Sequence, residues 1–196
     1  MQARTALQGL PGAVDKAAVA AVNKTLTRMR TQVSKGLAGP RGFLNLKQAN
    51  LKRRLIVKKA TRTSLIGSLK IMGRPIGLVN FNAKDTRRST YDRSGQGVHV
   101  QVIRGGPRVG NYGSQGQFND LDHAFIAEGL SGNRHVFMRR FESRLPLDNL
   151  YSQRLYDLFK ISPVPAKLRE FVPDELDKQI RSQIDRFLVQ GLKKKR

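Results

Sequence analysis

The sequence predicts an α+β fold, with a helix near each end of the chain and a strongly bent antiparallel sheet of about five strands between them. Apolar residues recur every three or four positions near both termini, as in helices, and every second position in the middle, as in strands. No segment of the sequence repeats, so residues 1–196 are expected to form a single domain.

The first predicted element is a long helix from about Pro11 to Lys35. Proline suits a first turn, and Gly36 followed by Gly39-Pro40 is a stop signal. The expected apolar stripe consists of Leu7, Leu10, Val14, Ala17, Ala21, Thr25 and Met29. A short second helix is predicted to begin at Asn45 and to run into Lys52-Arg53-Arg54.

Alternation of period two then predicts the strands. The expected segments are Ser64–Ile71, Ile76–Phe81, Val98–Val102, Ala124–Ala127 and His135–Met138, of which the last two form a hairpin. Gly67 and Gly77 suggest bulges or sharp bends. Two polar loops, Asn82–Gly97 and Gly105–Asp120, exceed the usual connection length and are predicted to be mobile until they bind a partner.

The last predicted element is a helix that Pro173 opens, after an irregular stretch ending in Ile161-Ser162-Pro163-Val164-Pro165. Its apolar residues stand at four-residue steps and are expected to face the core: Leu176, Ile180, Ile184 and Leu188. The acids Asp174, Glu175 and Asp177 would lie in its first turn, where they meet the positive end of the helix dipole.

The charge distribution is the strongest functional signal. The first 84 residues hold 17 Lys/Arg and one acid, Asp15, in a chain whose formal net charge is +23. Self-repulsion of this size disfavours a compact state unless acidic surface or a polyanion compensates it. The sequence therefore predicts assembly on nucleic acid or on an acidic protein.

The candidate contact residues are six cations within eleven positions: Lys52, Arg53, Arg54, Lys58, Lys59 and Arg62. Lys and Arg bind phosphate without reading bases, so a contact with the DNA backbone is one interpretation. An acidic protein surface is the second, and a solvated helix face is the third. No helix-turn-helix, zinc finger or aromatic stacking platform is present in the sequence, so sequence-specific recognition is not predicted.

Catalysis, metals and cofactors are not predicted. The chain has no cysteine, and His99, His123 and His135 occur in or beside separate strands, with Asp120, Asp122 and Glu128 near His123. The Gly-rich segment Gly105–Gly110 lacks the Lys-Ser/Thr ending of a nucleotide-binding loop. No apolar run is long enough for a membrane span and no signal peptide is visible, so residence in the cytoplasm is expected.

Several motifs in order resemble the prophage minor tail protein Z family of long-tailed bacteriophages. They are Ala124-Phe125-Ile126, the run Gly132–Arg140, Leu145-Pro146-Leu147-Asp148, and Ile161–Pro165. The opening helix with Ala20-Ala21-Val22-Asn23, the basic Arg53-Arg54-Leu55 stretch and the segment Val172–Leu176 also match, so the resemblance runs from about Leu7 to Lys195. The two polar loops are where departure from the family is expected.

The resemblance implies a non-enzymatic virion protein that completes the tail at its head-proximal end and helps to seat the genome end. It implies a homo-oligomeric ring, contact with other tail or neck proteins such as a tail terminator ring, and proximity to packaged DNA. Assembly would take place in the host cytoplasm. A free-standing nucleic-acid-binding protein without tail partners is the alternative, and a nuclease is disfavoured because acids for a metal are missing from the first 84 residues.

Overall fold

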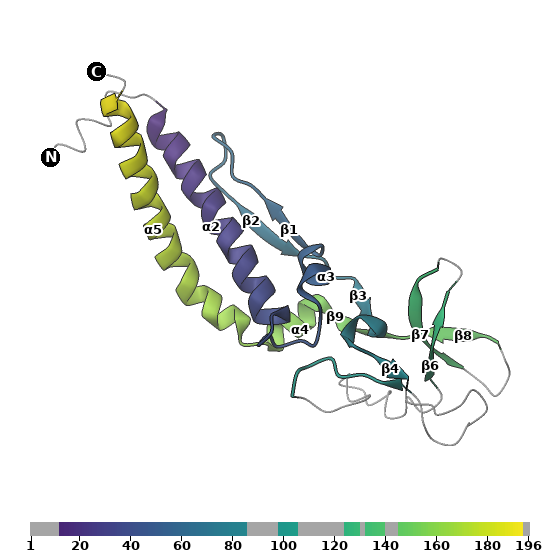
Figure 1. Cartoon of the computed structure of the whole chain (residues 1–196). Coiled ribbons are helices and arrows are strands. Elements are labelled where there is room, and N and C mark those ends of the chain that lie inside the picture. The colour runs from purple at the N-terminus through teal and green to yellow at the C-terminus, as the bar shows by residue number, and fades with distance from the viewer. Residues whose placement is uncertain (1–11, 86–97, 106–123, 130–131, 140–144, 194–196) are drawn as a thin grey trace. The chain divides into compact units, whose positions relative to one another are not determined.

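The protein has the predicted α+β fold, with a long helix near each end of the chain and short antiparallel strands between them (Figure 1). The computed structural model describes residues 12–85, 98–105, 124–129, 132–139 and 145–193. These residues form two compact units. The first comprises the chain up to Val33, Leu55–Ile71 and the chain from Val164; the second comprises Ser34–Arg54 and Met72–Pro163.

The opening helix is confirmed as α2 (Ala13–Ala38). Ala17, Ala21 and Thr25 of the predicted stripe are buried, whereas Val14 is 53% exposed. Leu7 and Leu10 lie outside the described residues. Because alanine is small, an element that packs on this stripe can approach α2 closely.

A two-stranded hairpin of the first unit packs on α2. It pairs β1 (Leu55–Lys58) with β2 (Ser68–Ile71), so that Leu55 faces Ile71 and Val57 faces Leu69 on one aliphatic side. Side chains alternate along a strand, so the other side carries Ile56, Lys58, Ser68 and Lys70. Strand β1 was not predicted, and β2 begins four residues after the predicted start at Ser64.

The closing helix, α5 (Val164–Lys193), runs antiparallel to α2, and α2 lies between α5 and the hairpin (Figure 1). The prediction that Pro173 opens this helix was wrong, because Pro173 lies inside it. Pro165 falls in the first turn instead, where proline's missing N–H costs no hydrogen bond. Asp174, Glu175 and Asp177 are therefore mid-helix residues rather than first-turn residues.

The predicted core face of α5 was also wrong. Ile180 is 39% exposed, and Leu176 and Ile184 are half-buried. Glu175, Gln179 and Gln183 are buried in their place, with 7%, 5% and 2% of their surface exposed. We call Glu175, Gln179 and Gln183 the polar seam, and Leu176, Ile180 and Ile184 the aliphatic row. The side chain of Leu188 lies outside the described part.

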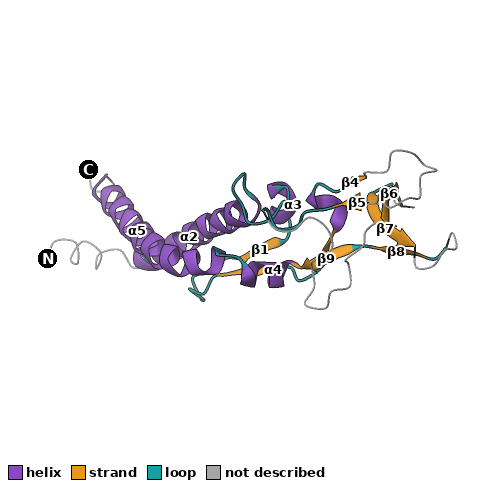
Figure 2. Ribbon diagram, turned by 90° about the horizontal axis from the view of Figure 1, so that it is seen from below, coloured by secondary structure: helices purple, strands orange, loops and turns teal. Residues whose placement is uncertain are grey.

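The second unit contains the other strands, in three small antiparallel sheets (Figure 2). They are β3 (Pro75–Gly77) with β9 (Tyr151–Arg154), β4 (Lys84–Asp85) with β5 (Val98–His99), and β6 (Ala124–Glu128) with β7 (Arg134–Arg139) and β8 (Leu147–Asn149). The described chain thus holds four small sheets in place of one sheet of about five strands. The predicted β6–β7 hairpin is confirmed, with Phe125 opposite Phe137, and a register shift at Gly77 confirms the irregularity expected there.

Three short helices complete the second unit: α3 (Gln48–Lys52), the 3₁₀ helix η1 (Leu78–Phe81) and α4 (Leu155–Ile161). Their largest fully buried side chains are Leu51, Phe81, Leu155 and Leu158. Strands β8 and β9 and helix α4 occupy most of the stretch that was predicted to be irregular. The predicted mobile loops, Asn82–Gly97 and Gly105–Asp120, fall mostly outside the described residues.

Candidate nucleic-acid interface

The six predicted contact residues divide between the two units. Lys52, Arg53 and Arg54 belong to the second unit, and Lys58, Lys59 and Arg62 belong to the first. They do not share one helix, because the chain leaves α3 at Lys52 and enters β1 at Leu55. Each group of three is therefore described separately.

The first group follows the buried Leu51, which anchors α3 in the core of the second unit. Lys52 ends this helix, Arg53 is its C-cap, and both side chains are exposed. Arg54 is half-buried, and its guanidinium donates hydrogen bonds to the backbone oxygens of Arg74 at 3.0 Å and Pro75 at 3.4 Å. Arg54 thus holds the backbone at the start of β3, and Lys52 and Arg53 have more exposed side chains than Arg54.

The second group lies on the β1–β2 hairpin. Lys58 points to the outer side of β1, and Lys59 and Arg62 follow in the connection; all three are exposed. Lys70, which sequence reasoning missed, joins them because β2 returns antiparallel to β1 and places it opposite Ile56 on the same outer side. Only the strand register reveals Lys70, because it is eight residues from Arg62 in the sequence.

The connection between the strands, residues 59–67, is fastened to α2 at two points. The side-chain amide of Asn23 donates to the carbonyl of Ala60 at 3.1 Å, and its oxygen accepts from the Ala60 N–H at 2.9 Å. Gly67 lies against Val22 and Leu26, and a Cβ at residue 67 would stand 2.3 Å from Leu26 Cδ1. We call residues 59–67 the hairpin loop. Its backbone is fixed, so its exposed side chains are presented in a defined place.

No acidic residue occurs between Lys16 and Lys84 in the sequence, so the hairpin and α3 contain no carboxylate of their own. The cations of these elements therefore create a positive potential that is compensated little within the same segment. An exposed cationic strand pair can contact phosphates by charge alone, without base readout. The arrangement suits a polyanion or an acidic surface rather than a small ligand.

The histidines do not form a site in the described chain. His99 is exposed on β5, and His135 on β7 packs its ring 5.9 Å from that of Phe137. His123 and most of Gly105–Gly110 lie outside the described residues. Among the residues that the structure describes, no group of three or more His, Cys, Asp or Glu side chains could hold a metal ion. None of the described helices is long and apolar enough to span a membrane.

Comparison with known protein families gives a match. The model of the prophage minor tail protein Z family matches residues 2–190. The chain belongs to this family. As a member of the minor tail protein Z family it is a structural component of a bacteriophage tail. It interacts with other tail proteins. No curated protein and no solved structure matches the chain.

Proposed function

We propose that this tail protein completes the tail at its head-proximal end, as a homo-oligomeric ring, and that its exposed cations contact the end of the packaged genome. The observation that carries the proposal is the charge of the first 84 residues, 17 cations against one acid. In a tail, the position nearest to a dense polyanion is the end that adjoins the DNA-filled head. A chain with a net charge of +23 is stabilised there by the counter-charge of phosphate.

The exposed hairpin cations Lys58, Lys59, Arg62 and Lys70 are the candidates for this contact in the first unit. Lys52 and Arg53 are the corresponding candidates in the second unit. Arg54 is a weaker candidate because its guanidinium is engaged with the backbone of Arg74 and Pro75. A non-catalytic role agrees with the family, which is one of minor tail proteins.

The proposal is tested by replacing Lys58, Lys59 and Lys70 with Gln. Exposed charges away from packing change stability little, so the variant should fold normally. DNA affinity should fall, and the slope of log affinity against log salt should shrink by about 0.9 for each phosphate that the variant no longer neutralises. Particles carrying the variant should assemble tails and be poorly infectious. A matched control replaces three exposed cations of α5, Lys167, Arg169 and Lys178, which have acids on the same helix.

Other outcomes would reject the DNA contact. Normal DNA association with failed incorporation into tails would assign the hairpin cations to an acidic protein surface. If neither DNA association nor incorporation into tails changes, the hairpin cations are simply a solvent-exposed surface without a partner. Tight DNA binding by a chain that never enters tails would favour the alternative of a free-standing nucleic-acid-binding protein.

The position in the particle needs its own measurement. An image of the assembled virion with the chain carrying a bulky tag should show added density at the junction of head and tail. Added density at the far end of the tail would overturn the head-proximal assignment, whatever the DNA measurements give.

A further inference from the structure

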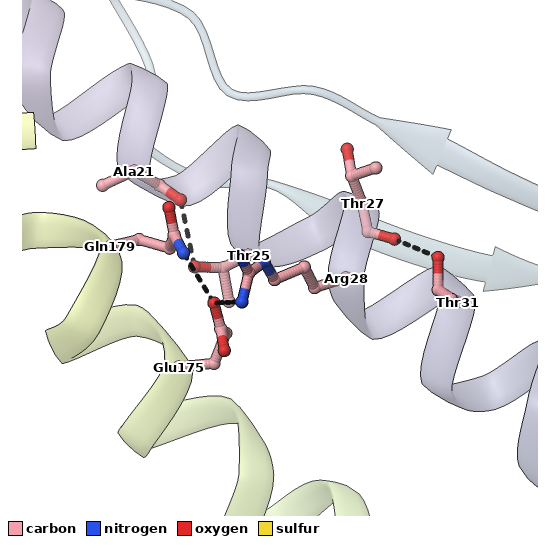
Figure 3. Close-up of polar contacts among 7 residues, drawn as sticks. All are labelled: Ala21, Thr25, Thr27, Arg28, Thr31, Glu175 and Gln179. Atoms are coloured by element: carbon pink, nitrogen blue, oxygen red, sulfur yellow. Dashed lines mark hydrogen bonds and ion pairs between the residues drawn. The ribbon is translucent and has the colours of Figure 1, made fainter. Parts of the chain in front are cut away.

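Helix α5 buries its polar seam and covers its aliphatic row only in part, since Leu176 and Ile184 are half-buried and Ile180 is exposed. A helix on the surface of a globular protein normally does the reverse, because burying apolar area is favourable and burying polar groups is costly. In Figure 3, Glu175 and Gln179 point toward Ala21, Thr25 and Arg28 of α2. Ile180 meanwhile keeps 39% of its surface exposed. The aliphatic row is thus incompletely covered within the described chain.

The hairpin loop presents a second uncovered apolar pair. Leu65 is 49% exposed and Ile66 is 79% exposed, although the loop backbone is fastened to α2 through Ala60 and Gly67. A turn closed by the hydrogen bond from Thr61 N–H to the Ser64 carbonyl, at 2.8 Å, further fixes the loop. Because the loop backbone is fixed in this way, Leu65 and Ile66 stay exposed.

The two apolar surfaces have complementary charged borders. Lys59 and Arg62 are exposed in the hairpin loop, in a segment without acids. Glu170 and Asp174 are exposed on α5 at positions i and i+4, and Asp177, at i+7 on the same edge of the helix, already pairs with Arg181 at 2.8 Å. The stretch Val164–Arg186 contains five Lys/Arg and five Asp/Glu, so it has no net charge in a chain of +23. Of the elements of the first unit, α5 is the one that repels a cationic loop least.

One copy cannot join its own two surfaces, because they lie on different sides of α2. Asn23, Val22 and Leu26 contact the hairpin loop, whereas Arg28 contacts Glu175 of α5. Figure 1 shows α2 between the hairpin and α5. A contact between different surfaces on successive copies is heterologous and generates a ring or a filament.

We infer that Leu65 and Ile66 of one copy pack on the aliphatic row of the next copy, with Arg62 facing the acids at the edge of that neighbour's α5. The inference rests on the proposed ring and names the surfaces that build it. It takes Arg62 out of the set of phosphate contacts and leaves Lys58, Lys59 and Lys70 on the hairpin for DNA.

The absence of cysteine from the sequence allows a test by cross-linking without background. The purified full chain carrying both Ile66→Cys and Ile180→Cys is oxidised and separated on a non-reducing denaturing gel. A ladder of covalent multimers is expected, because each copy offers one cysteine to each neighbour. Either single variant should stay monomeric. The control Ile66→Cys with Ser182→Cys should also stay monomeric, because Ser182 is exposed about half a helical turn away from Ile180.

A mixing experiment tests the same geometry without cysteines. Ile66→Asp and Ile180→Asp each place a charge in one of the two apolar surfaces. Because both side chains are exposed, each variant should fold, and circular dichroism would verify this. Sedimentation should show that each variant alone loses the multimers of the wild type. Mixing the two should restore pairs, because each copy keeps one intact surface, but nothing larger.

Three results would overturn the inference. They are a covalent dimer from Ile180→Cys alone, which would indicate a symmetric α5–α5 contact; no ladder from the double variant; and multimers that survive either aspartate substitution. The head-proximal position is measured by imaging virions and is independent of these experiments. A ladder together with density elsewhere in the particle would preserve the inference and reject the proposed position.

Discussion

The guanidinium of Arg28 on α2 lies 2.9 Å from Oε1 of Glu175 on α5, and this ion pair joins the two long helices of the first unit (Figure 3). The carboxylate side chain is only 8% exposed, whereas the arginine is 53% exposed. Oε1 also accepts a hydrogen bond of 2.7 Å from the amide of Gln179. A buried carboxylate is thus held by one cation and one amide.

Arg28→Ala should destabilise the protein by about 1–3 kcal/mol, because it leaves the buried Glu175 carboxylate without its cation. The matched control is Arg181→Ala, which removes an arginine 2.8 Å from Asp177, an acid whose side chain is 59% exposed. The control should cost at most about 0.5 kcal/mol, as exposed pairs usually do. Urea unfolding of both variants measures the difference, and equal losses would show that burial of Glu175 contributes nothing.

Two glutamines of the polar seam should respond to substitution in opposite directions. The Nε2 atom of Gln183 is buried without a hydrogen-bond partner among the described residues, whereas that of Gln179 donates to Glu175. Gln183→Met removes an unsatisfied amide and should stabilise the protein by about 1 kcal/mol. Gln179→Met removes a partner of the carboxylate and should destabilise it by about 1–3 kcal/mol. Thermal unfolding midpoints that move in the same direction would contradict this reading of the seam.

Asn23→Ala should release the hairpin loop, because Asn23 satisfies both backbone groups of Ala60. We expect a loss of about 1–3 kcal/mol and faster hydrogen exchange at the Ala60 amide. Thr27→Ala serves as the control, since its exposed hydroxyl bonds only to the carbonyl of Asn23 one turn earlier. Unchanged exchange at Ala60 in the Asn23 variant would mean that other contacts hold the loop.

Alanine substitutions on the two sides of α5 should change the free energy of unfolding by different amounts. Leu168 is 8% exposed, so Leu168→Ala should cost about 2–5 kcal/mol. Ile180→Ala should cost only about 1 kcal/mol when the chain is monomeric, because much of this side chain already contacts water. Unfolding is best measured at several protein concentrations. A large loss for Ile180→Ala that persists on dilution would place this side chain in the core after all.

The sequence predicted the elements whose signals are local. Long periodic segments identified α2 and the existence of α5, and the turn between Glu128 and Arg134 identified the β6–β7 hairpin. The buried face of α5 could not be chosen locally, because the polar seam and the aliphatic row have the same four-residue spacing. The choice depends on small and cationic side chains of α2 that are about 150 residues away in sequence, which sequence periodicity does not report.

In the candidate site, too, some features follow from the local sequence and others depend on the folded structure. Exposure of Lys52, Arg53, Lys58, Lys59 and Arg62 agrees with their interpretation as contact residues, but their contact with DNA remains a prediction. The structural use of Arg54 and the addition of Lys70 both depend on where β2 returns beside β1, since Arg54 binds backbone oxygens that follow β2. Adjacency in sequence placed six cations together, and strand pairing decides which of them share a side.

The polar seam has a calorimetric consequence. Exposure of apolar surface raises the heat capacity on unfolding, and exposure of polar surface lowers it. On α5, a carboxylate and two amides fill buried positions that leucines would occupy in an ordinary surface helix. The heat-capacity increment should therefore be somewhat smaller than it would be with leucines at these three positions, and the stability should vary slightly less steeply with temperature on both sides of its maximum.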